Sequence, residues 1–160
     1  MQAIVVKSSS LLQSNKRILG VAESCTGGLL AKLVTDLPGS SQWFDCGFIT
    51  YSNAAKIRAI GVMENTLLEN GAVSESVVIE MAQGVLANSD ANVSLSISGI
   101  AGPDGGTNDK PVGTVYIACC VSGDHCVAHR YSFSGDRNTV RKQAAMEALK
   151  LLNAELEKMK

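Results

Sequence analysis

A buried strand that runs through two glycines into a helix is the feature that most constrains the fold. The segment "RILGVAE" (17–23) is apolar enough for a buried strand, and "SCTGG" (24–28) follows it directly. In "LLAKLVTDL" (29–37) the apolar residues recur at helical spacing until "PGSS" ends the pattern. A second strand, "CGFITYS" (46–52), leads into a second helix, "NAAKIRAI" (53–60). This order predicts parallel β-α-β units.

The remaining segments add helices and an antiparallel hairpin. Ser52 and Gly61 are the expected N-cap and stop of the 53–60 helix, and Ser74 is the expected cap of a later one. Ser134 and Asp136 both remain candidate caps of the last helix. The other predicted elements are helices at 8–17, 73–89 and 134–159, a strand at 92–100, and strands at 112–123 and 125–133 joined through 122–124. Together they predict an α/β fold, a three-layer α/β/α sandwich with a mixed, mostly parallel sheet.

Composition limits the size, partners and location of the protein. A chain of 160 residues, 46% of them hydrophobic, predicts one domain spanning residues 1–160. The net charge of −1 gives no global attraction to nucleic acid or to an anionic membrane. No apolar stretch approaches the roughly 20 residues of a membrane helix, and no secretory signal is visible, so we expect a cytoplasmic protein. The five cysteines are expected to be reduced thiols, mostly core filler.

The residues after the first strand are the first candidate for chemistry. Ser24, Cys25 and Thr26 would stand at the carboxyl end of the strand, where ligands gather in such sheets. Gly27 and Gly28 would allow close approach to the helix N-terminus, which favours an anion. An equally good interpretation is a capped helix and a turn with no further role.

A lysine at the start of the second helix is the second candidate. Lys56 falls in the first turn, where the positive end of the helix dipole disfavours a cation. Burial would act in the same direction and make the amine a usable general base. Tyr51, at the end of the preceding strand, could orient or relay a proton. Taken alone, a surface lysine is the simpler interpretation.

A glycine-rich loop and two arginines are candidates for holding a ligand. The segment 96–114 contains five glycines between two strands, with Ser98 and Thr114 as polar groups on its flanks. Arg137 and Arg141 lie four residues apart near the start of the last helix, where they could bind phosphate. Neither histidine lies in these motifs, which leaves a serine or a cysteine paired with lysine as the available nucleophiles.

Six blocks, taken in order, resemble the CinA C-terminal domain family, which includes stand-alone nicotinamide-nucleotide amidases. The blocks are "VAESCTGG", "TYSNAAK", "GAVSESVVIEMA", "SGIAGPDGG", "KPVGTVYIA" and "FSGDR", and the match covers about residues 17–152. The resemblance implies the stand-alone form and a three-layer α/β/α fold.

The resemblance also implies an activity and a set of site residues. The expected reaction is hydrolysis of the carboxamide of nicotinamide mononucleotide to nicotinic acid mononucleotide and ammonia, in pyridine-nucleotide salvage. Ser24 falls on the family's nucleophile, Lys56 on its lysine and Tyr51 on its tyrosine, while backbone N–H groups near residues 26–28 or Gly99 would bind the oxyanion. No metal and no organic cofactor is implied, and the expected assembly is a homodimer. The residues expected to bind substrate are Thr26, Gly27, Gly28, Ser52, Ser98, Gly99, Gly102, Gly105, Gly106, Thr114, Arg137 and Arg141.

Two alternatives remain open at this point. The chain could be an inactive family member that acts as a nucleotide-binding or competence- or damage-related interaction module, although no basic stripe favours direct nucleic-acid binding. Alternatively, Cys25 rather than Ser24 could be the nucleophile, while Glu23 is expected to be a supporting carboxylate.

Overall fold

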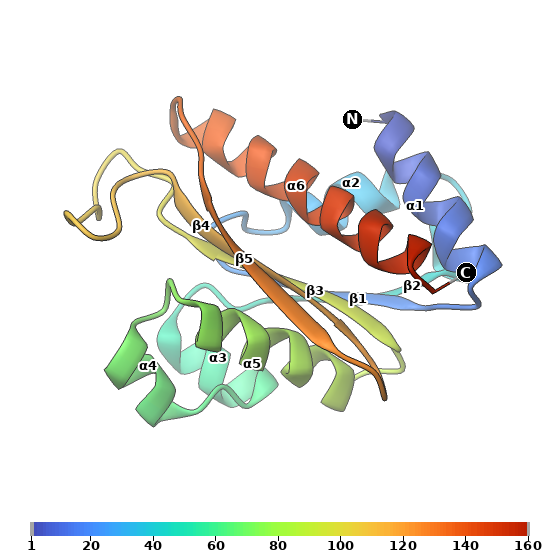
Figure 1. The fold of residues 1–160 in the computed structure, drawn as a ribbon, viewed down its shortest axis with the longest axis horizontal. Helices are drawn as coiled ribbons and strands as arrows, with labels where there is room; N and C mark the ends of the chain where they lie inside the picture. The colour runs from blue at the N-terminus through green and yellow to red at the C-terminus, as the bar shows by residue number, and fades with distance from the viewer. Residues whose placement is uncertain (1, 160) are drawn as a thin grey trace.

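The computed structural model describes residues 2–159 and contains a five-stranded sheet in the order β2-β1-β3-β4-β5 (Figure 1). β1 pairs in parallel with β2 and β3, whereas β4 runs antiparallel to both β3 and β5. The strands are β1 (Leu19–Glu23), β2 (Phe44–Ile49), β3 (Val93–Gly99), β4 (Thr114–Val121) and β5 (Cys126–Ser132). This arrangement confirms the predicted mixed sheet with a parallel core.

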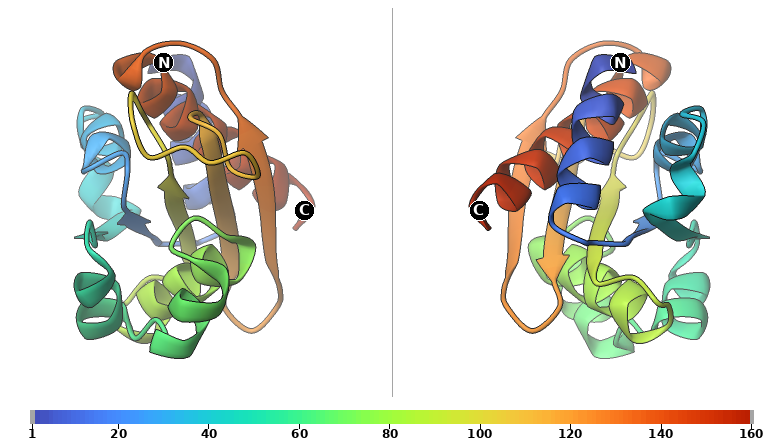
Figure 2. Two further views of the ribbon diagram at one scale, coloured as in Figure 1. Left: turned by 90° about the vertical axis from the view of Figure 1, so that its left-hand side faces the viewer. Right: turned by 90° about the vertical axis from the view of Figure 1, so that its right-hand side faces the viewer.

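Helices cover both faces of the sheet (Figure 2). One layer contains α1 (Gln2–Ser14), α2 (Leu29–Thr35) and α6 (Arg137–Glu157), and the other contains α3 (Asn53–Ile60), α4 (Glu64–Asn70) and α5 (Glu75–Ala87). A short 3₁₀ turn, Ser40–Gln42, precedes β2. The three-layer α/β/α sandwich expected from the sequence is therefore confirmed. Within residues 2–159, no helix is both long and apolar enough to cross a membrane.

The parallel strands β1 and β3 contribute side chains to the core on both faces of the sheet. Every residue of β1 is buried, and β3 is buried from Val93 to Ser98. Alternate side chains of a strand point to opposite faces, so each strand contributes to both helical layers. Leu95, for example, packs in the cluster beneath α6, while Ala22 packs in the cluster with α3 and α5.

Local signals located most helix ends correctly. Ser52 caps α3 by accepting the Ala55 N–H at 3.1 Å, and Gly61 ends that helix with a φ of 69°. Ser74 caps α5, and Asp136 rather than Ser134 caps α6. α1 begins well before the predicted 8–17 segment. α4 was missed because its two apolar residues, Leu67 and Leu68, are adjacent and show no helical repeat.

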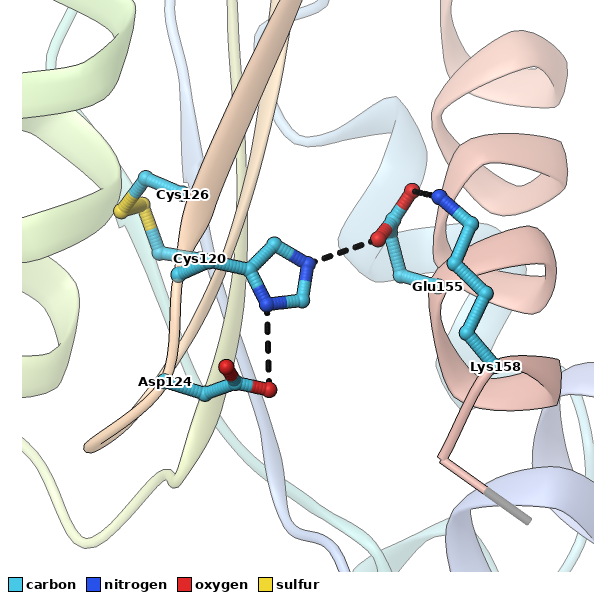
Figure 3. A network of polar contacts seen from close by, with 6 residues as sticks. Cys120, Asp124, Cys126, Glu155 and Lys158 are labelled. Carbon is cyan, nitrogen blue, oxygen red and sulfur yellow. Dashed lines mark hydrogen bonds and ion pairs between the residues drawn. A yellow bond between two sulfur atoms is a disulfide. The ribbon is translucent and has the colours of Figure 1, made fainter.

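The prediction that the cysteines are reduced is wrong for two of them. Cys120 and Cys126 form a disulfide across the β4/β5 hairpin (Figure 3). The physical reason is the register, because antiparallel pairing places these two residues directly opposite each other, with their Cα atoms 4.0 Å apart. Cys119 is on the other face of β4, in the core beneath α6, and remains a free thiol.

Candidate active site

The parallel strands end together, and backbone bonds join those ends. The Ser24 N–H donates to the Ile97 carbonyl of β3 at 3.0 Å, and the Thr50 N–H donates to the Glu23 carbonyl at 2.9 Å. Beyond β1 the chain makes a tight turn in which the Gly27 N–H donates to the Ser24 carbonyl at 3.0 Å. Gly27 and Gly28 both have positive φ, 57° and 96°, a conformation that glycine adopts without a steric penalty. The turn therefore presents Ser24 at the edge of the sheet expected from the sequence.

Glu23 supports this turn from beneath. Its carboxylate is fully buried and accepts the N–H groups of Gly28 and Leu30 on one oxygen, at 3.0 and 3.1 Å, and of Ala31 on the other, at 2.8 Å. It thus satisfies the free donors at the N-terminus of α2 and lies at the positive end of that helix. The supporting role expected for Glu23 is confirmed.

Hydrogen bonds within the turn occupy some of the N–H groups that the sequence suggested for binding an oxyanion. The Gly27 and Gly28 N–H groups, both within the segment expected to bind it, already have acceptors inside the protein. Within residues 2–159, no hydrogen bond to another residue is found for the Cys25 or Thr26 N–H. Within residues 24–28, this leaves the N–H groups of Cys25 and Thr26 as the candidate oxyanion donors.

Lys56 reaches Ser24 from the first turn of α3. Its side chain is almost completely buried, with 1% of the residue exposed, and its Nζ lies 3.1 Å from Ser24 Oγ and 2.8 Å from the Thr50 carbonyl oxygen. Burial lowers the pKa of this amine below its usual range, because the charged form is desolvated, and the nearby Cys25 thiol only partly opposes this shift. In the structure Nζ donates to both the Thr50 carbonyl and Ser24 Oγ; in a neutral amine the second contact can reverse, with the Ser24 hydroxyl donating to the nitrogen lone pair. The pair has the arrangement of a nucleophile and its general base.

Cys25 is a poor nucleophile in this setting. Burial raises the pKa of its thiol to about 11, and the nearby Glu23 charge adds to the effect, while its own backbone N–H, Arg141 and Lys56 oppose it. The reactive species is the thiolate, which is scarce at neutral pH for such a group. The electrostatics favour Ser24 over Cys25 as the nucleophile.

A surface cavity of about 280 Å³ opens beside Ser24. Arg137 connects the glycine-rich loop to Tyr51 at this cavity. Its Nη1 donates to the Gly102 carbonyl and its Nη2 donates to the Tyr51 hydroxyl, both at 2.9 Å. Tyr51 is 60% exposed, so its hydroxyl is accessible from solvent. The cavity is lined by Ser24, Cys25, Tyr51, Gly99, Ile100, Ala101, Gly102, Asp104, Gly105 and Arg137.

Several residues expected to bind substrate have structural partners instead of facing this cavity. The Ser52 hydroxyl caps α3, and the buried Ser98 hydroxyl donates to the Ala72 carbonyl at 2.7 Å. Thr26 and Thr114 are buried. Gly106, Gly27, Gly28 and Arg141 are also absent from the lining. Arg141 instead bonds to residues 24–28, the turn that carries the candidate nucleophile Ser24 and is here called the nucleophile turn.

Two contributors were missed from the sequence. The Thr50 main-chain carbonyl has no sequence signal, because only the fold shows where a carbonyl points. Asp104 was overlooked within the glycine-rich segment, although it is an acidic residue on the lining of the cavity. Its position between Pro103 and Gly105, in a loop after a buried strand, could have indicated it.

Comparison with known proteins adds to this geometry. The CinA C-terminal domain model matches residues 1–156. The chain belongs to the CinA C-terminal domain family.

Named members of the CinA family are close in sequence and in structure. The chain is 53% identical over 141 residues to nicotinamide-nucleotide amidohydrolase PncC of Escherichia coli K12, a match covering 88% of this chain and 86% of that protein. It is 58% identical over 128 residues to the protein of that name from Enterobacter agglomerans, covering 80% and 78% of the two chains. A CinA superfamily protein from Klebsiella pneumoniae has a TM-score of 0.94 at 35% identity, with 98% and 97% covered.

Proposed function

We propose that this chain is a nicotinamide-nucleotide amidohydrolase that converts nicotinamide mononucleotide to nicotinic acid mononucleotide and ammonia. The observation that carries the proposal is the buried Lys56 amine within 3.1 Å of Ser24 Oγ at the cavity. The names of the relatives from Escherichia coli and Enterobacter agglomerans support the substrate class.

In the first half of the reaction, Ser24 attacks the carboxamide carbon. The neutral Lys56 amine takes the hydroxyl proton as the bond from Oγ to carbon forms, and the carbonyl oxygen becomes an oxyanion. The N–H groups of Cys25 and Thr26 stabilise that charge, each by roughly 3 kcal/mol. The carbon–nitrogen bond then breaks, a proton passes to the departing nitrogen, ammonia leaves, and an ester at Ser24 remains.

Tyr51 is suited to deliver that proton. Its hydroxyl oxygen accepts a hydrogen bond from Arg137, so its own hydrogen is free to be donated to the leaving group. The proton that Lys56 took from Ser24 can then restore the phenol, through the substrate or a water molecule. This sequence leaves both groups in their starting states.

In the second half of the reaction, water hydrolyses the ester by the same machinery. Lys56 removes a proton from the water, the hydroxide adds to the ester carbon, and Oγ leaves with a proton from the Lys56 ammonium. The product is a carboxylic acid, which loses its proton to water to become the carboxylate, and Ser24 is regenerated. The lowering of the Lys56 pKa favours both halves, because the amine must be neutral at the start of each.

Arg137 and the glycine-rich loop are proposed to hold the sugar and phosphate. Arg137 uses two of its five N–H donors within the protein, and the others remain for a phosphate. Gly99, Gly102 and Gly105 line the cavity with main chain, so the loop backbone can approach the nucleotide closely.

The test is release of ammonia from nicotinamide mononucleotide by the purified protein without added metal. Ser24→Ala and Lys56→Met should each lower the rate by at least about a hundredfold, the lower end of the range for a general base. Cys25→Ala should retain most activity. The exposed Lys142→Met, which also removes a lysine charge, is the matched control and should match the wild type. Absence of wild-type activity would refute the proposal, and loss confined to Cys25→Ala would refute the serine mechanism.

A further inference from the structure

Arg141 makes a two-pronged contact with the main chain of the nucleophile turn. Its Nε donates to the Cys25 carbonyl oxygen at 3.1 Å, and its Nη2 donates to the Thr26 carbonyl oxygen at 2.7 Å. The side chain reaches from the second turn of α6 to a segment more than a hundred residues earlier in the sequence. A fork of this kind is specific to arginine, because a lysine ammonium is a single point of charge.

These two bonds determine the directions of the neighbouring N–H groups. In a planar trans peptide the carbonyl and the following N–H point in opposite directions. The Cys25 carbonyl points to Arg141, so the Thr26 N–H points away from it. The Thr26 carbonyl also points to Arg141, and the next N–H, that of Gly27, points away and donates to the Ser24 carbonyl. Arg141 therefore holds both peptide planes that follow Cys25.

We propose that Arg141 is a positioning residue for the oxyanion site, not a ligand of the substrate phosphate. It acts through the peptide between Cys25 and Thr26, keeping the Thr26 N–H directed at the oxyanion that forms next to Ser24. A guanidinium bound to the carbonyl also polarises the peptide and makes its N–H a stronger donor. This inference rests on the proposed amidase function.

The contrast with Arg137 supports this assignment. The two arginines are one helical turn apart on α6, but only Arg137 is among the residues that line the cavity within residues 2–159. Arg141 has both its Nε and one Nη committed to the turn and is only partly exposed. Arg137 therefore faces the cavity, whereas Arg141 faces the main chain of the nucleophile turn.

Kinetics and product binding separate the two roles. In Arg141→Met, a positioning role predicts that kcat for nicotinamide mononucleotide falls about a hundredfold, comparable to loss of one oxyanion donor, while KM stays within about twofold. The dissociation constant of nicotinic acid mononucleotide, which has the phosphate but forms no oxyanion, should be unchanged. Arg141→Lys should recover part of kcat, and Lys142→Met should match the wild type. A tenfold or greater weakening of product binding in Arg141→Met, with kcat retained, would overturn the inference.

A second measurement is independent of turnover. Hydrogen exchange of the amides at residues 27–29 should become at least about tenfold faster in Arg141→Met than in Lys142→Met, because the turn loses its anchor. If the wild type released no ammonia, the amidase proposal would fail, while this comparison would still test the anchor. Unchanged exchange would overturn it. If Arg141→Met does not fold, Arg141→Lys carries both measurements, with smaller effects in the same directions.

Discussion

Replacing Glu23 with glutamine tests whether one buried carboxylate organises the nucleophile turn. The substitution keeps the size and shape of the side chain but removes its charge and turns one acceptor oxygen into a donor. One Glu23 oxygen accepts two N–H groups and the other accepts only that of Ala31. The amide oxygen will therefore take the position with two bonds, and its NH₂ group will face the Ala31 N–H.

The expected cost follows from that geometry. An N–H left facing another donor costs about 1–3 kcal/mol, and each of the two remaining bonds loses its charge assistance, about 1 kcal/mol apiece. Loss of the favourable interaction with the N-terminus of α2 adds about 0.3–1 kcal/mol. The lower desolvation cost of an amide offsets part of this sum. We expect the free energy of unfolding to fall by about 3 kcal/mol.

Urea denaturation of Glu23→Gln measures this cost directly. A loss of about 3 kcal/mol corresponds to a fall in Tm of about 6–12 °C for a chain of this size. Glu64→Gln is the matched control, because Glu64 is also in the first turn of a helix but is exposed, and it should cost less than about 0.5 kcal/mol. The ammonia-release rate should also fall, since Ser24 follows Glu23 directly. A loss below about 1 kcal/mol would refute the argument that the carboxylate holds the turn.

Three further predictions concern more distant parts of the structure. Lys56→Met should raise Tm while abolishing activity, because burial disfavours the ammonium and lowers its pKa; a lower Tm at neutral pH would contradict this. Gly84→Ala should lower the free energy of unfolding by about 1–3 kcal/mol, because the added Cβ would overlap the Ile60 carbonyl at the end of α3. It should also lower kcat, because α3 carries Lys56, and an unchanged kcat would contradict this. Hydrogen bonds, first to Glu155 and then to Asp124, raise the pKa of His125 (Figure 3), so its stabilising effect is complete below about pH 6.5 and is lost as pH rises through the raised pKa. The stability of the wild type relative to His125→Asn should therefore be greater at pH 6 than at pH 8.5, and an unchanged difference would refute this contribution.

Local sequence patterns were sufficient for the elements that position the site. Ser52 and Gly61 bound α3 as predicted, and the alternation of strands and helices indicated the parallel core. These features depend on residues close in sequence, whose capping and periodicity are readable without the fold. The proximity of Lys56 to Ser24 followed from the rule that parallel strands end at one edge of the sheet.

Contacts between distant segments could not be read in the same way. The disulfide depends on the register of β4 and β5, and a shift of one residue would have separated Cys120 from Cys126. The two arginines of α6 lie on one face as expected, yet their roles differ because one reaches the cavity and the other reaches main-chain carbonyls. Periodicity predicts which side chains share a face of a helix, but not which distant residues each side chain contacts.

The role of Ser24 is difficult to predict from its sequence neighbours, because contacts with distant helices hold the nucleophile turn. Glu23 binds the N-terminus of α2, Ser24 faces Lys56 from α3, and the next two carbonyls bind Arg141 from α6. Successive residues thus face three different helices, and each helix restrains the turn from another direction. A strained or loosely held turn would let Ser24 Oγ move relative to the amine by more than a catalytic hydrogen bond tolerates. The reactivity of Ser24 therefore depends on restraints from distant parts of the chain. We expect substitutions of Glu23 and Arg141 to lower activity although neither side chain lines the cavity.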